Sequence, residues 1–152
     1  MATPTTAEER IEVNAAPEHV YDLVADLTRM GEWSPECYRV EWLRGATGPA
    51  VGARFNGHNR MGPYRWSVAG EVVAADPGKE FAFTTYVRDR ESTRWCYRFE
   101  PIGSGTLVTE SYDFIWATPL IRLGDVLMPR RRMLRKGMRH TLQRIKVAAE
   151  SR

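Results

Sequence analysis

The sequence predicts an α+β fold in which a curved antiparallel sheet of about seven strands wraps around a long C-terminal helix. Three observations predict it. Apolar residues recur at every second position through most of 38–114, as in strands with one buried face. The breaks between these runs are short and polar or rich in glycine, which favours antiparallel hairpins. The last third of the chain repeats apolar residues at helical spacing instead.

The N-terminal part predicts one strand and two short helices. Apolar and charged residues alternate over 8–14, so a strand is expected there. Pro17 suits the first turn of a helix, because its φ is already helical and its missing N–H is not needed there. Apolar residues then recur at helical spacing, and a second helical turn is expected over 28–33.

Six further strands and one long helix complete the predicted order. The strands are expected at 38–43, 53–60, 65–75, 80–88, 93–100 and 106–114. The helix is expected to begin near Pro129, with one apolar stripe along it: Leu127, Leu134, Met138, Leu142, Ile145 and Ala149. A single sheet of this length must curl around an apolar object, and the terminal helix is the object that remains.

Length and composition predict one domain over residues 1–152, with a core of about 6–149, because no linker or repeat divides the chain. No apolar run is long enough to predict a membrane span. The N-terminal MATPTTAEER lacks the apolar and basic parts of a secretory signal. Cys37 and Cys96 are far apart and have no ligand-spaced partner, which excludes a disulfide scaffold and a cysteine zinc site. We expect a cytoplasmic protein.

Four stretches carry a family likeness: EVNAAPEHVYDLVADLTRMGEWSP, VGARFNGHNRMG, RWSVAGEVVAADPGKEFAF and TRWCYRFEPIGSGTLVTESYDF. They resemble the polyketide cyclase/dehydrase-like branch of the START/Bet v1-like (SRPBCC) superfamily, over about residues 6–145. The resemblance implies a helix-grip fold with a deep cavity for lipids, polyketides or other apolar molecules. In this fold Trp33, Gly57 and Asn59 would lie near the wall or mouth of the cavity. The superfamily contains carriers, sensors and a minority of enzymes, so the resemblance assigns no reaction.

Alternation along the strands assigns an inward set of side chains. On the strand expected at 93–100, Trp95, Tyr97 and Phe99 face one way and charged residues the other. Aromatic rows with a few hydroxyl groups suit a ligand pocket, although a packed core contains such rows as well. The expected ligand-binding residues are Trp33, Asn59, Trp66, Phe83, Thr85, Trp95, Tyr97, Glu110, Tyr112, Leu134 and Met138.

Glu110 is the most specific candidate for a polar functional residue in the cavity. If Val108, Tyr112 and Phe114 face inward on the last strand, Glu110 faces inward with them. A carboxylate on an apolar face is costly unless it is paired, hydrogen-bonded or protonated. Glu110 is therefore a polar anchor or an acid–base group inside the cavity, unless an arginine pairs with it or a register slip turns it outward.

Motifs of covalent, metal or phosphate chemistry are absent from the sequence. It contains no Rossmann or P-loop glycine pattern, no HExxH and no GxSxG. His19, His58 and His140 are scattered, and His58 faces either the cavity or solvent. Cys96 alternates with inward Trp95 and is expected to face away from the pocket.

We therefore expect no metal and no cofactor, and a carrier or sensor of a hydrophobic molecule rather than an enzyme. One alternative is a cofactor-independent cyclase or dehydratase, in which Glu110 and either Tyr97 or Tyr112 move protons while the walls fold the substrate.

A second alternative rests on the basic start of the terminal helix, which could meet an anionic membrane surface. Its cationic residues are Arg130, Arg131, Arg132, Arg135, Lys136 and Arg139. The preceding segment, FIWATPLIRLGDVLMP, is unusually apolar and suggests a lid or a contact surface. The alternative without a function is that the arginines simply form the solvent-exposed outer face of the helix. Nucleic acid is a less expected partner, because no DNA-reading motif is present, and a homodimer stays open.

Overall fold

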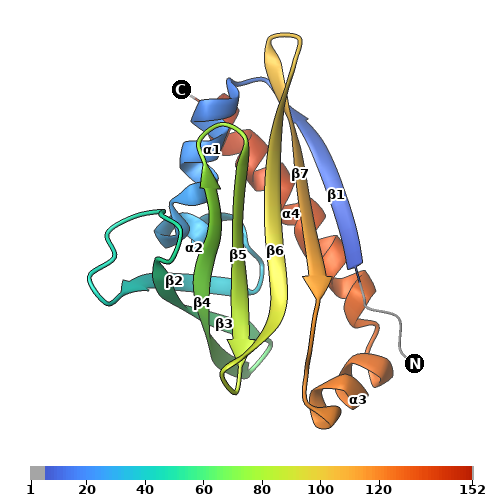
Figure 1. Ribbon diagram of the computed structural model, residues 1–152. Coiled ribbons are helices and arrows are strands. Elements are labelled where there is room, and N and C mark those ends of the chain that lie inside the picture. The colour runs from blue at the N-terminus through green and yellow to red at the C-terminus, as the bar shows by residue number, and fades with distance from the viewer. Residues whose placement is uncertain (1–5, 152) are drawn as a thin grey trace.

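The computed structural model describes residues 6–151, and seven antiparallel strands form one sheet in the order β1-β7-β6-β5-β4-β3-β2 (Figure 1). The strands are β1 Thr6–Val13, β2 Cys37–Leu43, β3 Arg54–Met61, β4 Tyr64–Asp76, β5 Glu80–Val87, β6 Arg90–Ile102 and β7 Gly105–Phe114. The helices are α1 Pro17–Ala25, α2 Met30–Trp33, α3 Pro119–Leu127 and α4 Arg130–Glu150, with a 3-10 turn over Leu27–Arg29. The predicted fold class is confirmed.

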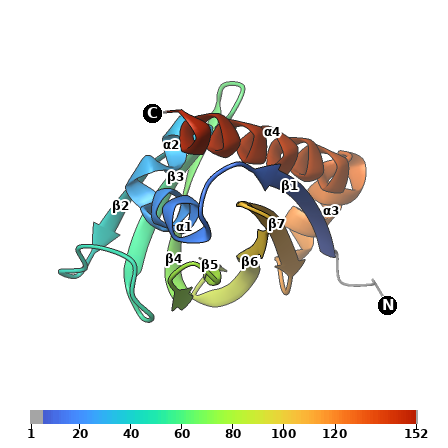
Figure 2. The same ribbon diagram turned by 90° about the horizontal axis from the view of Figure 1, so that it is seen from above.

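The sheet curves into a trough, and α4 runs along its open side (Figure 2). α4 packs along edge strand β1, while α1 and α2 pack at one end of the trough. Met138, Leu142 and Ile145 are buried where α4 faces the sheet. This is the stripe that the helical spacing predicted.

Close packing along the sheet depends on a missing side chain at Gly70. A Cβ atom at Gly70 would lie 2.2 Å from the ring of Phe55 on β3, so the ring occupies the space of a side chain. The Phe55 ring then meets Phe83 on β5 edge to face, with centroids 5.4 Å apart. The aromatic core therefore continues across β4.

The apolar segment before the terminal helix forms a separate helix, α3, which was not predicted. Leu127 ends α3 and is 76% exposed, so its assignment to the apolar stripe of the long helix is wrong. The physical reason is Pro129, which disfavours helical dihedrals at the residue before it. Met128 accordingly adopts extended dihedrals, φ −108° and ψ 144°, and separates the two helices.

Candidate ligand-binding site

A buried tyrosine and a buried glutamate form the centre of the candidate site. Tyr97 on β6 and Glu110 on β7 lie opposite each other in the antiparallel register. The Tyr97 hydroxyl donates a hydrogen bond to Glu110 Oε2 at 2.8 Å. Glu110 is only 3% exposed and makes no ion pair with any residue of 6–151, so neither an arginine partner nor an outward register accounts for it.

Two buried polar atoms on β7 have no partner among residues 6–151. They are Glu110 Oε1 and the hydroxyl oxygen of Tyr112, two residues further along the same face of β7. Leaving a buried polar atom unpaired costs about 1–3 kcal/mol, so such atoms are rare in folded proteins. The two atoms are therefore suited to a polar group from outside the chain, such as a ligand oxygen or a water molecule.

Burial determines the protonation state of the cluster. It raises the pKa of Glu110 to about 8, although the hydrogen bond from Tyr97 lowers it, and the negative charge of Glu9 raises it further. The pKa of Tyr97 is raised well above its usual value by burial and by Glu110. Glu110 is thus mostly a neutral acid at pH 7, and its hydroxyl can donate to an acceptor.

Apolar side chains surround these polar atoms. The ring of Trp95 lies 5.2 Å from the ring of Tyr112, and Phe83 lies opposite Trp95 on β5. Tyr112 and Met138 are buried, yet both lie outside the main packed cluster of core residues. Tyr97 belongs to the main packed cluster, so its hydrogen bond to Glu110 lies within the core, whereas Tyr112 lies outside that cluster.

The other predicted ligand residues are more dispersed. Trp33 is fully buried in the main core, which is consistent with a structural role. Trp66 is half-buried and stacks on exposed Tyr64 near the β3–β4 hairpin, opposite Asn59. Thr85 on β5 and Leu134 on α4 are also half-buried. The pairing of β5, β6 and β7 thus places Phe83, Trp95, Tyr97, Glu110 and Tyr112 at neighbouring positions of the sheet. Trp33 belongs to the same packed cluster as Phe83 and Tyr97, whereas Asn59 and Trp66 pair with each other on β3 and β4.

Sequence reasoning missed two inward side chains, Glu9 and Cys37. Glu9 on β1 lies opposite Glu110 and pairs with Arg135 at 2.7 Å and Arg139 at 3.2 Å. Alternation with inward Val13 would have found Glu9. Cys37 lies close enough to raise the pKa of Tyr97, and its own thiol pKa is raised to about 11 by burial.

His58 lies on the outer face of the sheet, in a chain with Glu41 and Ser67. His58 Nε2 is 2.9 Å from Glu41 Oε1, and His58 Nδ1 is 3.0 Å from Ser67 Oγ. The order resembles an acid–base–nucleophile chain, but Ser67 is exposed on an open surface. Acyl transfer needs donors for an oxyanion in a water-excluded site, so we assign the chain to cross-strand stabilisation. Cys96 also faces outward, towards Glu80.

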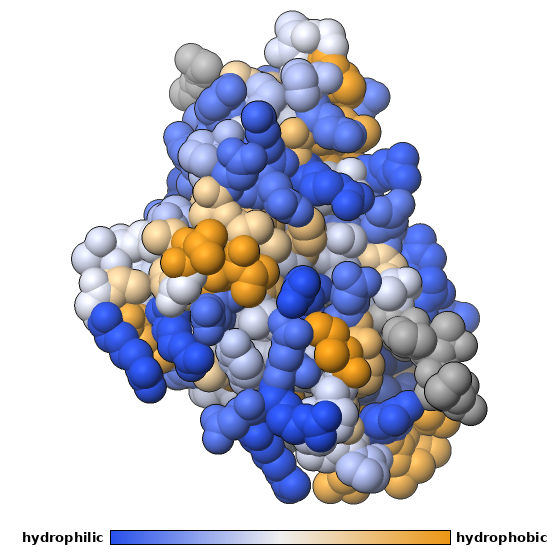
Figure 3. Space-filling model, in the orientation of Figure 1, coloured by the Kyte–Doolittle hydropathy of each residue, from blue (hydrophilic) through white to orange (hydrophobic). Residues whose placement is uncertain are grey.

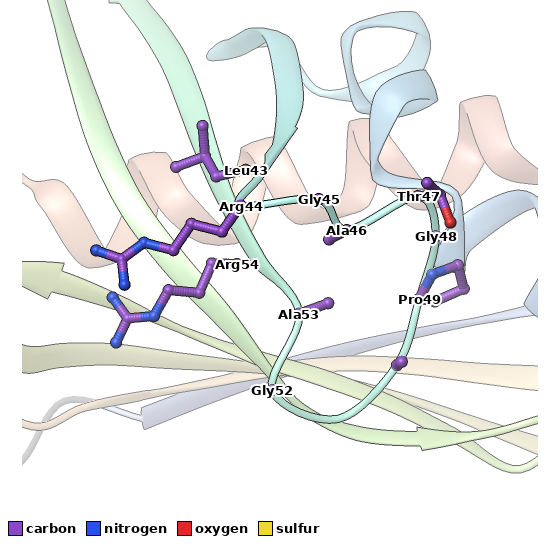
Figure 4. A pocket seen from close by; sticks show the side chains of 11 residues that line it. Leu43, Arg44, Gly45, Ala46, Thr47, Gly48, Pro49, Gly52, Ala53 and Arg54 are labelled. Atoms are coloured by element: carbon purple, nitrogen blue, oxygen red, sulfur yellow. The ribbon is translucent and has the colours of Figure 1, made fainter.

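Two surface hollows lie elsewhere. One, of about 640 Å³, is formed by the loop between β2 and β3 and is bordered by Arg44 and Arg54 (Figure 4). The other, of about 550 Å³, lies between α3 and α4 and is lined by residues including Arg131 and Arg135. Neither is lined by the Tyr97–Glu110 pair.

Within 6–151, no three metal-ligating side chains gather, and no helix is long and apolar enough to cross a bilayer.

The predicted basic surface is partly engaged within the chain. Arg130 forms a two-pronged ion pair with Glu36, at 2.7 and 2.8 Å. Arg131 donates to the Thr6 carbonyl, and Arg135 and Arg139 share Glu9. Arg132 and Lys136 are exposed and make no ion pair within residues 6–151.

A curved antiparallel sheet that holds a terminal helix in its trough is the helix-grip fold, which a solved START superfamily protein shares. A family model described as polyketide cyclase/dehydrase and lipid transport matches residues 4–150. The chain belongs to this family.

Solved structures agree with the assignment. A polyketide-cyclase-like protein from Corynebacterium glutamicum, Cgl2372, is 32% identical, with a TM-score of 0.66, and the match covers 99% of this chain and 94% of that one. A START superfamily protein from Mycobacterium smegmatis is 14% identical, with a TM-score of 0.71 and 95% and 97% coverage. The di-domain ARO/CYC protein StfQ of the steffimycin biosynthetic pathway is 18% identical, with a TM-score of 0.76, over 97% of this chain and 51% of StfQ. A search of curated proteins found no match.

Proposed function

We propose that the protein is a carrier or sensor that binds one small hydrophobic molecule beneath α4, with Glu110 as its polar anchor. The observation that supports the proposal is the pair of unpartnered buried atoms, Glu110 Oε1 and the Tyr112 hydroxyl, on the inward face of β7. A ligand with one oxygen could accept from neutral Glu110 while its apolar body contacts Trp95 and Met138. The two unpaired cysteines support a reducing, cytoplasmic setting.

Membership of a family whose description includes lipid transport supports the hydrophobic class of ligand. Trp95 is half-buried, so part of its ring is accessible to a ligand.

The test is an equilibrium titration with a fluorescent fatty acid and, separately, with a flat aromatic probe. Wild type, Tyr112→Phe and the exposed-site control Glu100→Gln are compared. We expect saturable binding to at least one probe, weakened roughly fivefold to tenfold by Tyr112→Phe because one hydrogen bond is lost, and unchanged by the control. Saturable binding that is indifferent to Tyr112→Phe would contradict contact between the ligand and the unpartnered Tyr112 hydroxyl, on which the proposal rests.

The second candidate is a cofactor-independent cyclase or dehydratase. The observation that favours it is a carboxylic acid whose pKa is about 8, hydrogen-bonded to a tyrosine at 2.8 Å. An acid–base group is most effective when its pKa lies near the working pH. Glu110→Gln separates the two functions, since it keeps the shape of the neutral acid but holds no exchangeable acid proton. It should abolish turnover in an enzyme and only change affinity in a carrier.

A further inference from the structure

Helix α3 presents an apolar face to solvent. Leu120, Leu123 and Leu127 are 79%, 54% and 76% exposed, and no residue of α3 is buried. Positions separated by three and four residues lie on one side of a helix, so the three leucines form a continuous stripe. Figure 3 shows this patch as the orange surface at the lower right, where α3 lies in Figure 1. A contiguous exposed apolar face of this kind marks an interaction surface.

The helix is well formed at its start. The side chain of Thr118 accepts a hydrogen bond from the Ile121 N–H at 3.3 Å and caps the first turn. Pro119 occupies the first helical position, where its fixed φ favours the helix. The leucine stripe therefore belongs to a defined amphipathic helix of nine residues.

Positive charge surrounds the leucine stripe. Between residues 115 and 139 the chain carries seven Lys or Arg residues and one acid, Asp125. Glu36 and Glu9 neutralise part of this charge from other elements. Arg122, Arg132 and Lys136 are exposed and have no ion pair in the part of the chain that the structure describes.

We propose that α3 and the first turns of α4, residues 119–136, dock the protein on an anionic phospholipid bilayer. In this arrangement α3 lies in the plane of the membrane interface, with the leucine stripe among the acyl chains. The exposed cations Arg122, Arg132 and Lys136 lie near the headgroup phosphates. This combination of an apolar face and a basic polar face is what distinguishes helices that bind the interface from helices that span it.

Charge complementarity selects the membrane over other partners. A second copy of this chain would bring its own arginines against the same basic surface, which is unfavourable. A nucleic acid would meet the cations but would leave the leucine stripe exposed. An anionic bilayer satisfies both features at once. The proposal does not depend on the hydrophobic ligand. The membrane surface predicted from the sequence was the arginine cluster alone; because Arg130 is paired with Glu36, the proposed surface instead combines the leucine stripe with the exposed cations.

The test is co-sedimentation with vesicles of phosphatidylcholine, with and without phosphatidylglycerol, at low and high salt. Two double variants, Leu123→Ser/Leu127→Ser and Arg132→Glu/Lys136→Glu, and the single-substitution control Val147→Ser are compared with wild type. Val147 is 58% exposed on α4, so the control removes a similar apolar group elsewhere. All substituted side chains are exposed, and circular dichroism checks that each variant is folded.

We expect binding to the anionic vesicles that weakens about tenfold or more in each double variant and at high salt, with no change in the control. Absence of binding to phosphatidylglycerol vesicles would overturn the proposal. So would binding that ignores the leucine substitutions, because charge alone would then explain it. Leucine-dependent dimers in sedimentation velocity, without vesicle binding, would identify a second copy as the occupant instead.

Discussion

The substitution Glu110→Gln tests the buried-acid interpretation through stability rather than activity. Burial raises the pKa of Glu110 to about 8 in the folded protein. A glutamate in the unfolded chain titrates near 4.3. Between these values the folded state holds a proton that the unfolded state has released, so the free energy of unfolding falls as pH rises.

The magnitude follows from the size of the pKa shift. Each unit of difference is worth about 1.4 kcal/mol, so wild type should lose on the order of 5 kcal/mol between pH 4 and pH 8 from this group. Glutamine has the shape of the neutral acid and cannot ionise. Glu110→Gln should therefore match wild type within about 1 kcal/mol at pH 5 and be more stable by several kcal/mol at pH 9.

Urea unfolding between pH 5 and pH 9 measures the difference directly. The difference between the two proteins cancels the titration of all other groups, and Glu100→Gln on the exposed face of β6 serves as the matched control. The expected difference grows by about 1.4 kcal/mol per pH unit up to pH 8. Parallel wild-type and Glu110→Gln profiles would show instead that Glu110 has an ordinary pKa in the folded protein.

Four further substitutions, in two pairs, test the local packing. Tyr112→Phe removes an unpartnered buried hydroxyl, so it should raise the stability of the ligand-free protein by about 1 kcal/mol, whereas Tyr97→Phe should lower it by a similar amount because it breaks a hydrogen bond. A change in the free energy of unfolding in the same direction for both variants, measured with urea, would contradict this prediction. Gly70→Ala should destabilise by about 1–3 kcal/mol, because the Phe55 ring fills the space of its Cβ. At Gly124 an added Cβ would have no neighbour within 4 Å, so Gly124→Ala should instead stabilise α3 by about 0.5–1 kcal/mol. The melting temperature should therefore fall in Gly70→Ala and rise in Gly124→Ala.

Alternation along the strands was sufficient to predict the inward row of the site. Glu110 and Tyr112 lie two residues apart on β7, and a period of two places them on the same face. The same rule fails at Cys37, because the register shifts between Cys37 and Arg39 at a β-bulge. A bulge adds one residue to a strand, so the side chains beyond it point to the opposite face of the sheet. The local sequence pattern does not predict a bulge.

Contacts between distant segments could not be predicted from periodicity. Arg130 and Glu36 are 94 positions apart, and only the path of α4 across the trough brings them together. Helix α3 was missed for a different reason. Its apolar residues are exposed, so the rule that apolar periodicity marks a buried face assigned Leu127 to the core.

Native mass spectrometry of protein purified from its own host, followed by organic extraction, shows whether the fold holds a hydrophobic ligand. We predict one apolar molecule per chain, with an oxygen that meets Glu110 or the Tyr112 hydroxyl, and a smaller bound fraction in Tyr112→Phe. An empty protein that also fails to bind fluorescent fatty acids and flat aromatics would contradict the account. The trough would then be a filled core, and the exposed α3 surface would become the leading functional feature.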